Sequence, residues 1–158
     1  MVMRRGGFTL VEVLIVVLII GILAMVVVPR VVTAAAQARE SALETDLIVI
    51  RRAVDLYRAE HDGRLPHLDE AGNVSLAGIS WRLTRPTTPT GKLDPNGECG
   101  PYLNEWPANP YISGPAGRQI TCGAAADAPR DDSSGWYYST TTGLVHVNSS
   151  RGALDIDP

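Results

Sequence analysis

A single carboxylate, Glu12, lies inside the most apolar stretch of the chain. Of the 21 residues from 8 to 28, only Thr9, Glu12 and Gly21 are not apolar. A carboxylate within such a span costs up to about 2.5–3.5 kcal/mol on membrane insertion scales, and such residues are rare unless they are paired. Glu12 is therefore the first candidate for a functional residue.

No partner for Glu12 is expected on its own helix. The residues three and four positions away are Phe8, Thr9, Ile15 and Val16. None of them carries a charge, so the spacing at which helical side chains meet offers no ion pair. The partner is therefore expected to be a newly created charge or a residue of another subunit. Cleavage between Gly7 and Phe8 would create one such charge, the α-amine of Phe8.

The residue types that often carry catalysis are scattered along the sequence. His61, His67 and His146 fall at a predicted helix end, in a loop and in a strand. The sequence contains no nucleophile elbow, no glycine-rich phosphate loop and no recognisable metal-ligand spacing. We therefore expect surface or capping roles for the histidines, predict no catalytic residue, and do not expect an enzyme.

The two cysteines, Cys99 and Cys122, both belong to the part of the chain predicted to lie outside the cytoplasm. An even number of cysteines in an oxidising compartment favours a disulfide. In the chain-entropy model, closing this loop of about 24 residues stabilises the fold by about 3 kcal/mol. We therefore expect a Cys99–Cys122 bridge; the alternative is a pair of reduced thiols, since the spacing does not suggest zinc.

The element that positions Glu12 is a predicted transmembrane helix over residues 8–28. At about 1.5 Å per residue, 21 helical residues reach about 30 Å, the thickness of the hydrocarbon core of a bilayer. Arg4 and Arg5 precede the span and should keep the N-terminus cytoplasmic. The alternative is a secretory signal peptide cleaved near Ala34–Ala36. The length of the span and its carboxylate count against that alternative.

An amphipathic helix half is predicted over residues 29–62, so that one helix runs from about Phe8 to about His61, some 80 Å. Its apolar stripe repeats at steps of four and three and consists of Leu43, Leu47, Ile50, Val54 and Tyr57. Charged residues occupy mostly other faces. Gly63 is the expected C-cap, and Pro66 prevents much continuation. Pro29 predicts a kink or local melting, or simply a bend where the span leaves the membrane.

Residues 63–158 predict a small, loop-rich β domain. Leu65, Leu68, Leu76, Ile79, Trp81 and Leu83 are expected to cover the helix stripe. One hairpin is predicted from strands at 111–113 and 119–121, and a stronger one from Trp136–Ser139 and Leu144–Val147, turning over 140–143. The fold class is therefore α+β, with a small antiparallel sheet packed on the second half of the helix.

Composition excludes other functional classes. The formal charge is −3 and Lys92 is the single lysine, which argues against a surface for nucleic acid phosphates. With 158 residues, the chain is too short for a large multidomain enzyme.

The segment Gly7-Phe8-Thr9-Leu10-Val11-Glu12, after a basic leader and before an unbroken apolar span, resembles the prepilin signature of type IV pilins and type II secretion pseudopilins. The resemblance implies a pilin-like fold, cleavage after Gly7 by prepilin peptidase, and methylation of Phe8. It also implies that Glu12 pairs with the N-terminus of a neighbouring subunit during assembly. Gly21 and Pro29 stand where the family commonly has Gly and Pro, and mark the expected helix break.

Two further segments resemble, more loosely, those of major type II secretion pseudopilins. They are Arg64-Leu65-Pro66 after the helix and the segment from Trp106 to Tyr111. Major pseudopilins bind calcium near the C-terminus, and the candidate ligands here are Asp127, Asp131 and Asp132. The usual Gly-Ala-Asp-Gly type segment is absent, so a solvated turn is the favoured interpretation and no cofactor is predicted.

The resulting hypothesis is a structural subunit with four parts: a leader (1–7), a transmembrane helix half (8–28), an amphipathic helix half (29–62) and a β domain (63–158). It is expected in the bacterial inner membrane as a single-pass protein, with the N-terminus cytoplasmic and the domain periplasmic or extracellular. It would polymerise into a type II secretion pseudopilus that serves protein export. Expected partners are further copies, minor pseudopilins, prepilin peptidase and the inner-membrane assembly platform, but not nucleic acid.

Two alternatives stay open at this point. One is a type IV or competence pilin subunit, and the other is a binding module tethered by a single span. Replacement of Glu12 distinguishes a tether from a filament subunit, because only assembly should depend on this carboxylate.

Overall fold

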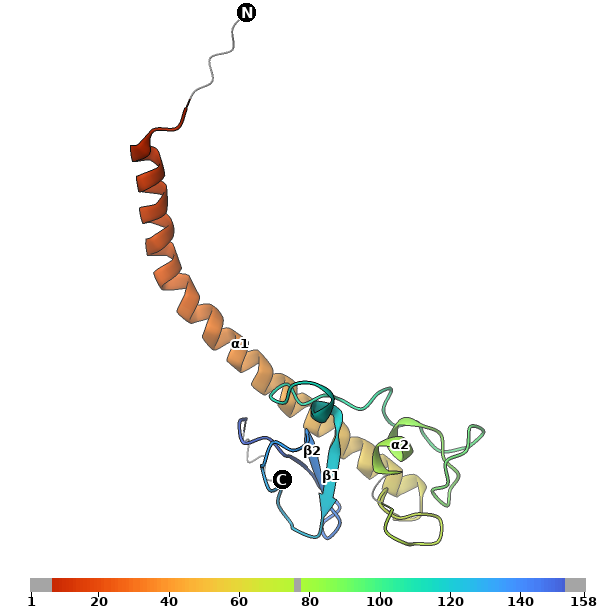
Figure 1. Cartoon of the computed structure of the whole chain (residues 1–158). Coiled ribbons are helices and arrows are strands. Elements are labelled where there is room, and N and C mark those ends of the chain that lie inside the picture. Colours follow the sequence, from red (N-terminus) through yellow and green to blue (C-terminus); the bar gives the residue numbers. More distant parts are fainter. Residues whose placement is uncertain (1–6, 76–77, 153–158) are drawn as a thin grey trace, which may run out of the picture. The chain divides into compact units, whose positions relative to one another are not determined.

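The structure, a computed structural model, describes residues 7–75 and 78–152. The chain divides into two compact units, Met1–Ala38 and Arg39–Pro158, which we describe separately. The elements follow one another in the order shown in Figure 1. They are α1 (Leu10–Glu60), α2 (Ile79–Thr84), the 3-10 helix η2 (Pro115–Arg118), β1 (Ile120–Gly123), β2 (Trp136–Ser139) and β3 (Val145–Val147).

Helix α1 is one uninterrupted element of 51 residues, which belongs to both units. The expected helix break at Gly21 and Pro29 is not present, because both positions lie within the helical backbone. A proline removes one backbone donor from a helix, but the hydrogen bonds on either side of it can maintain the helical path. The expectation of a break in this structure is therefore wrong.

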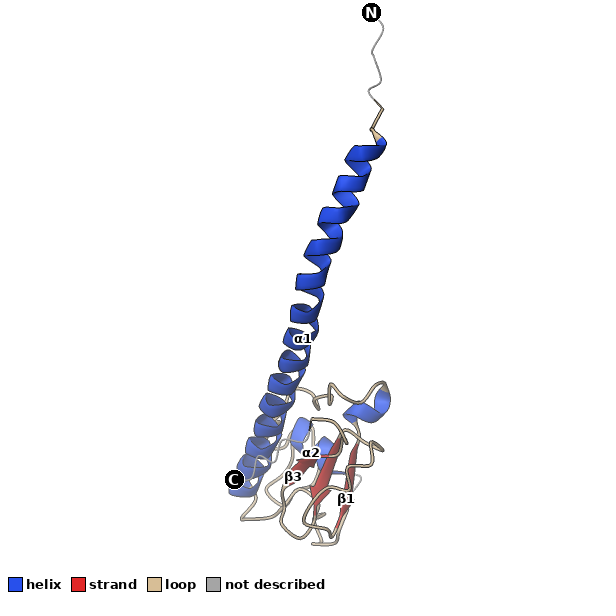
Figure 2. Ribbon diagram, turned by 90° about the vertical axis from the view of Figure 1, so that its left-hand side faces the viewer, coloured by secondary structure: helices blue, strands red, loops and turns tan. Residues whose placement is uncertain are grey.

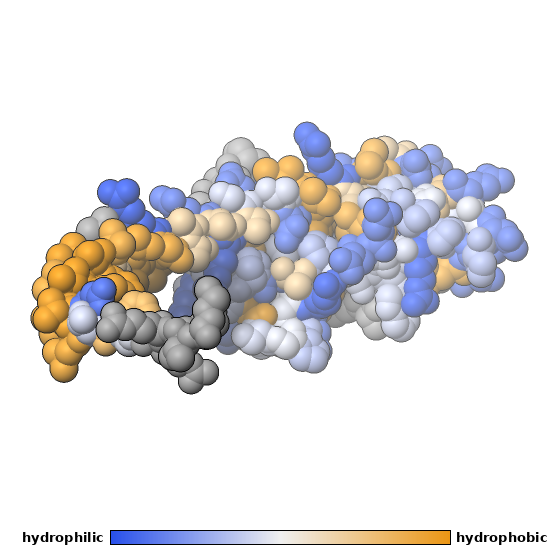
Figure 3. All heavy atoms as spheres, turned by 90° about the horizontal axis from the view of Figure 1, so that it is seen from above, coloured by the Kyte–Doolittle hydropathy of each residue, from blue (hydrophilic) through white to orange (hydrophobic). Residues whose placement is uncertain are grey.

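In the first unit, α1 exposes its apolar side chains instead of burying them. Leu14, Leu18 and Leu23 are each about 60% exposed. By length and composition this helix is able to cross a membrane. Figure 3 shows the hydrophobic side chains gathered around this part of the chain. A helix that is apolar on all sides needs an apolar environment, which lipid or other helices can supply.

In the second unit, the predicted stripe of α1 forms the centre of the core. Its five residues are at most 4% exposed, which confirms the period-3.6 pattern. They pack with side chains from α2, the following loops and the sheet, namely Ile79, Leu83, Leu103, Trp106, Trp136, Tyr138, Val145 and Val147. Of the residues expected to cover the stripe, Trp81 is instead half exposed, and Leu76 lies outside the described residues.

The end of α1 is fixed by its capping geometry. The N–H of Gly63 donates to the carbonyl of Arg58 at 2.9 Å, which is the long hydrogen bond of a Schellman motif. Asp62 and Gly63 both have positive φ, 53° and 79°. The helix therefore stops at Glu60, one residue before the predicted end, and Gly63 contributes the conformational freedom expected of it.

The stronger of the two predicted hairpins is confirmed. Strand β2 pairs antiparallel with β3, with Trp136 opposite Val147 and Tyr138 opposite Val145. The turn is closed by the N–H of Gly143, which donates to the carbonyl of Ser139 at 2.8 Å. All four residues of β2 are buried, so this strand is the central one of the three.

The other predicted hairpin is wrong, and the sheet is mixed rather than antiparallel (Figure 2). Strand β1 pairs parallel with β2, with Cys122 opposite Tyr138. Residues 111–113 form a turn instead of a strand, because the N–H of Ile112 donates to the carbonyl of Asn109 at 3.2 Å. Gly117 allows this turn to lie close, since a Cβ there would be 2.5 Å from the carbonyl oxygen of Ile112. The α+β class with a long N-terminal helix is confirmed.

Three side-chain hydrogen bonds join the domain to the part of α1 that lies in the second unit. The hydroxyl of Tyr111 donates to the Glu40 carboxylate at 2.5 Å, and that of Tyr102 donates to Glu60 at 2.6 Å. Arg51 donates through Nε to the carbonyl of Val145 at 3.1 Å. Tyr111 belongs to the segment from Trp106 to Tyr111, which resembles a segment of major pseudopilins. Through Tyr111, this segment has a structural role in holding the helix.

Candidate processing and assembly site

The start of α1 is a capping box built from Thr9 and Glu12. Thr9 precedes the first helical residue, and its hydroxyl accepts a hydrogen bond from the N–H of Glu12 at 3.3 Å. In return, Glu12 Oε2 accepts from the N–H of Thr9 at 2.7 Å and from its hydroxyl at 2.8 Å. Two backbone donors that a helix start leaves without partners are thereby satisfied reciprocally.

The expectation that no nearby residue pairs with Glu12 is therefore wrong. Thr9 is uncharged but carries two donors, the backbone N–H and the hydroxyl, that reach the same carboxylate oxygen. The sequence held the signal: Thr-x-x-Glu directly before an apolar run is the pattern of a capping box. Opposite charges at helical spacing do not reveal this pattern, because Thr9 is uncharged.

The bond between Gly7 and Phe8 lies just outside the helix. Residues 7–9 are neither helical nor paired in a sheet, and Gly7 and Phe8 are exposed, with 87% of Phe8 accessible. Apart from its chain neighbours, no heavy atom of the described residues lies within 4 Å of the position that a Cβ on Gly7 would occupy. A protease could therefore reach this bond without unwinding α1.

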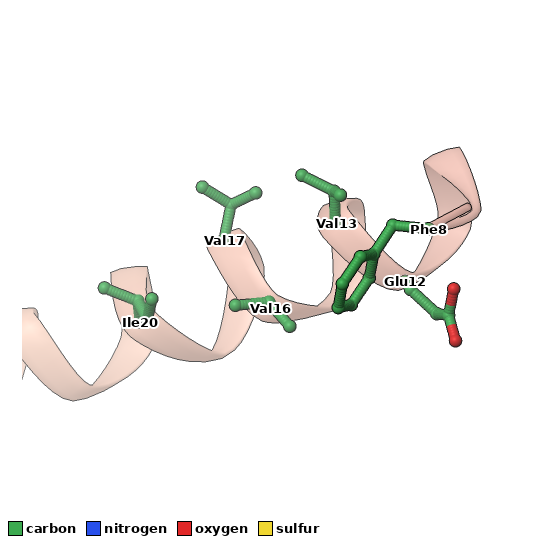
Figure 4. A pocket seen from close by; sticks show the side chains of 6 residues that line it. All are labelled: Phe8, Glu12, Val13, Val16, Val17 and Ile20. Atoms are coloured by element: carbon green, nitrogen blue, oxygen red, sulfur yellow. The ribbon is translucent and has the colours of Figure 1, made fainter. Parts of the chain in front are cut away.

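Phe8 and Glu12 belong to one shallow groove along the helix. The other lining residues are Val13, Val16, Val17 and Ile20. Figure 4 shows the ring of Phe8 folded back towards Val16 and the carboxylate of Glu12 directed away from the helix axis. The groove thus combines an apolar floor with one acceptor group near the Gly7–Phe8 bond.

The predicted disulfide is absent, since Cys99 and Cys122 are free thiols. Cys99 is held at the end of α1, with Sγ 3.9 Å from the carbonyl oxygen of Glu60 and its backbone paired with Thr87. Cys122 lies in β1, opposite Tyr138. The two thiols are thus held by different segments of the domain, and no bond joins them in this structure.

The three aspartates considered for calcium do not form one site. Within the described residues there is no group of three acidic, histidine or cysteine side chains that could hold a metal ion. Asp131 accepts from Asn148 Nδ2 at 2.9 Å and Asp132 accepts from the hydroxyl of Ser150 at 2.7 Å. Hydrogen bonds from Ser133, and then the one from Asn148, lower the pKa of Asp131, while those from Ser150 lower the pKa of Asp132. The contacts with Asn148 and Ser150 also hold this loop against the segment after β3.

Two of the histidines have structural roles. His61 is fully buried, with Nδ1 donating to the carbonyl of Tyr57 at 2.7 Å and Nε2 3.0 Å from the hydroxyl of Thr87. His67 lies 3.0 Å from the hydroxyl of Tyr138, and burial together with Arg82 lowers its pKa. Both rings are therefore used to join segments of the core.

Comparison with protein families matches residues 2–28 to the prokaryotic N-terminal methylation motif. That range contains Gly7, Phe8, Thr9 and Glu12. The type II secretion system core protein G of Pseudomonas aeruginosa is 40% identical over 109 residues, which cover 68% of this chain and 69% of that protein. The chain belongs to the type II secretion system core protein G family.

Other core G proteins match over the same share of this chain, at lower identity. The protein of Vibrio cholerae is 32% identical over 108 residues, covering 68% of this chain and 66% of its own length. The protein of Escherichia coli K12 is 29% identical over 108 residues, covering 68% of each. The match therefore covers about two thirds of these core G relatives. No solved structure matches the chain with significant similarity.

Proposed function

We propose that this core protein G is the structural subunit of a type II secretion pseudopilus, made as a precursor, cleaved after Gly7 and polymerised through its N-terminal helix. The observation that carries the proposal is the position of Glu12. It is the single carboxylate of the apolar half of α1, it caps the helix start, and it lies within the matched methylation motif. The name shared by the relatives places such a subunit in protein export.

Cleavage would change the chemistry of the capping box. Hydrolysis of the Gly7–Phe8 amide releases a carboxylate on Gly7 and an amine on Phe8, which is protonated at neutral pH. This cation would arise one residue before Thr9, beside the carboxylate that Thr9 already holds. A Glu12 that faces an ammonium in an apolar environment is stabilised in its charged form, whereas an unpaired one is penalised. Such a pair sets the register of a filament more than it adds net stability.

The apolar half of α1 supplies the physical reason for assembly. Its exposed leucine, isoleucine and valine side chains need lipid before assembly and other helices afterwards. A head-to-tail contact between identical copies is heterologous and generates an open filament. We therefore place the precursor in the bacterial inner membrane with Arg4 and Arg5 on the cytoplasmic side and the domain across the membrane. Prepilin peptidase, minor pseudopilins and the assembly platform are the proposed partners.

The mature N-terminus tests the processing step. We expect intact-mass and peptide mass spectrometry to find a chain that starts at Phe8 and carries one methyl group on the α-amine. Replacement of Glu12 by Leu should leave this cleavage intact and reduce the yield of sheared filaments at least about tenfold, since one lost charge pair at an interface commonly has that effect. Replacement of the neighbouring Val13 by Leu is the matched control. A mature chain that starts at Met1 or near Gln37 would contradict the proposal, as would normal filaments from the Glu12→Leu variant.

A further inference from the structure

Asn96 is the one asparagine of this chain that a glycine follows. The other asparagines precede Val74, Glu105, Pro110 and Ser149. In an Asn-Gly pair the backbone nitrogen of the glycine can attack the side-chain carbonyl carbon of the asparagine, because no Cβ on the glycine hinders the approach. Asparagine is among the thermolabile residue types. The sequence at this position therefore has the components of a self-modification site.

The structure places Asn96 and Gly97 in a tight turn at the surface of the second unit. The N–H of Gly97 donates to the carbonyl of Asp94 at 2.9 Å, and the N–H of Asn96 donates to Asp94 Oδ1 at 2.9 Å. Pro95 occupies the second position of the turn, where its fixed φ is favourable. Asn96 is exposed, and its carboxamide forms no hydrogen bond with the residues that the structure describes. The group to be attacked is therefore accessible, whereas the attacking nitrogen is engaged.

Gly97 is also fixed by close contact with Thr87. A Cβ at position 97 would collide with the carbonyl oxygen of Thr87, so a larger residue does not fit there without a shift. Thr87 is itself fully buried. Backbone hydrogen bonds of 2.9 and 3.0 Å pair it with Cys99, and its hydroxyl lies 3.0 Å from His61 Nε2. The core thus holds Gly97 in place, and this contact explains why a glycine stands here.

We propose that Asn96-Gly97 is a self-deamidation site, closed in the folded domain and opened when the domain unfolds. In the reaction, the nitrogen of Gly97 bonds to Cγ of Asn96 and gives up its proton through water to Nδ2. The bond from Cγ to Nδ2 then breaks, and ammonia leaves. Water opens the resulting cyclic imide at either carbonyl, which leaves an aspartate or an isoaspartate at position 96. No oxidant, reductant or second enzyme takes part.

The fold opposes this reaction at its first step. Ring closure removes the N–H of Gly97 and with it the hydrogen bond that closes the turn at Asp94. It also requires the nitrogen to turn towards the carboxamide of Asn96, a movement that the contact of Gly97 with Thr87 opposes. Unfolding removes both restraints together, so the rate should follow the population of the opened segment.

The modification should also hinder the return to the folded state. An isoaspartate places one additional methylene in the main chain, directly before the residue that has no spare room against Thr87. The turn from Asp94 and the pairing of Thr87 with Cys99 then no longer fit together. A chain that stays unfolded for long is therefore marked covalently and loses its ability to fold.

Peptide mass spectrometry of the full-length chain tests the site. Samples in non-ionic detergent at mildly alkaline pH are aged with and without guanidinium chloride and then digested with trypsin. The peptide from Leu93 to Arg118 contains Asn96 together with Asn104 and Asn109, which serve as internal controls. We expect Asn96 to be converted to its two carboxyl products at least about tenfold faster in the unfolded sample. The two control residues should be converted far more slowly in both samples.

An Asn96→Gln variant is the matched control, because its longer side chain would need a larger ring to cyclise and should show no conversion in either state. After ageing in denaturant and refolding, the wild-type chain should recover less native tryptophan fluorescence than this variant treated alike. Equal rates in the folded and unfolded wild-type chain would overturn the protection by the turn. An unchanged Asn96 in the unfolded chain would overturn the site itself, and full refolding of converted chains would overturn the consequence for folding.

Discussion

At the scale of single residues, Glu12 caps the start of α1, and the proposed function gives it a second task. In the precursor it closes a capping box with Thr9, which satisfies donors at the start of α1. In the proposed function, the same carboxylate accepts an N-terminal ammonium after cleavage. On that proposal, one residue connects the folding of the helix start with assembly. The cost of a carboxylate in the span is the physical reason why such a residue needs these partners.

The two free thiols carry a prediction at this same scale. Burial raises the pKa of Cys122 to about 11 and also raises that of Cys99. Because the thiolate is the reactive form, both should be unreactive in the folded chain at neutral pH. We expect maleimide labelling at pH 7.5 to be at least about tenfold slower in the native protein than in the urea-unfolded protein, where two labels should be incorporated.

The control for this experiment is an Asn104→Cys variant, because Asn104 is exposed and a thiol there should react at once. An unfolded, unreduced wild-type chain that takes up no label would mean that the two cysteines form a bridge after all.

At the scale of elements, α1 is one helix in two kinds of surroundings. Its first half presents apolar side chains on all sides, whereas its second half presents one buried stripe to the domain. The sequence pattern changes accordingly, from uniformly apolar to a period of 3.6. The hydrogen bonds of Tyr111 with Glu40 and of Tyr102 with Glu60 hold the two ends of this second half.

Two leucines of the second half provide a matched test of the stripe. Leu47 is 2% exposed in the core, whereas Leu56 is 54% exposed on the same helix. We expect Leu47→Ala to lower the free energy of unfolding by about 2–5 kcal/mol, through lost burial and a cavity. Leu56→Ala should change it by less than about 0.5 kcal/mol. Urea unfolding of the whole chain in detergent, followed by tryptophan fluorescence, measures both. Equal effects would contradict the assignment of the buried face.

At the scale of the domain as a whole, segments far apart in sequence are joined by buried polar contacts. His67, in the loop after α1, lies 3.0 Å from the hydroxyl of Tyr138 in β2. Asn109 donates from Nδ2 to the carbonyl of Gly135 at 2.9 Å. This hydrogen bond joins the turn before η2 to the residue that precedes β2. Buried polar groups that are satisfied in this way specify one arrangement of the loops, because a shifted loop would leave them without partners.

The contact of His67 makes stability depend on pH. Burial and the nearby Arg82 lower its pKa below the ordinary 6.5, so the unfolded chain binds this proton more readily than the folded one. The free energy of unfolding should therefore be fully retained above about pH 6.5 and should fall as the pH drops through 6.5 towards the lowered pKa.

Urea unfolding of the whole chain at a series of pH values between about 7.5 and 5 measures this effect. In a His67→Asn variant, which keeps an acceptor for Tyr138, the slope over this range should become smaller. A wild-type chain whose stability rises on acidification would contradict the assigned direction.

The sequence by itself determined the features that depend on local pattern. The apolar run over residues 8–28 is long enough, as a helix, to span a bilayer. The stripe from Leu43 to Tyr57 follows from apolar residues repeated at the period of a helix. The hairpin of β2 and β3 is likewise local, because a short turn joins two strands of mainly aromatic and β-branched residues that are close in sequence. The prepilin signature around Glu12 indicated the wider pilin and pseudopilin family for the same reason, since the matching motif is confined to residues 2–28.

Only the tertiary structure decided the contacts between distant segments. The parallel pairing of β1 with β2 depends on how residues 124–135 return the chain, and no local pattern encodes that path. The missing disulfide has the same cause: loop closure makes a Cys99–Cys122 bridge favourable in principle, but the fold fixes the two thiols in different places. Local propensity depends on residues that are close in sequence, whereas burial and long-range pairing arise only when the chain has packed.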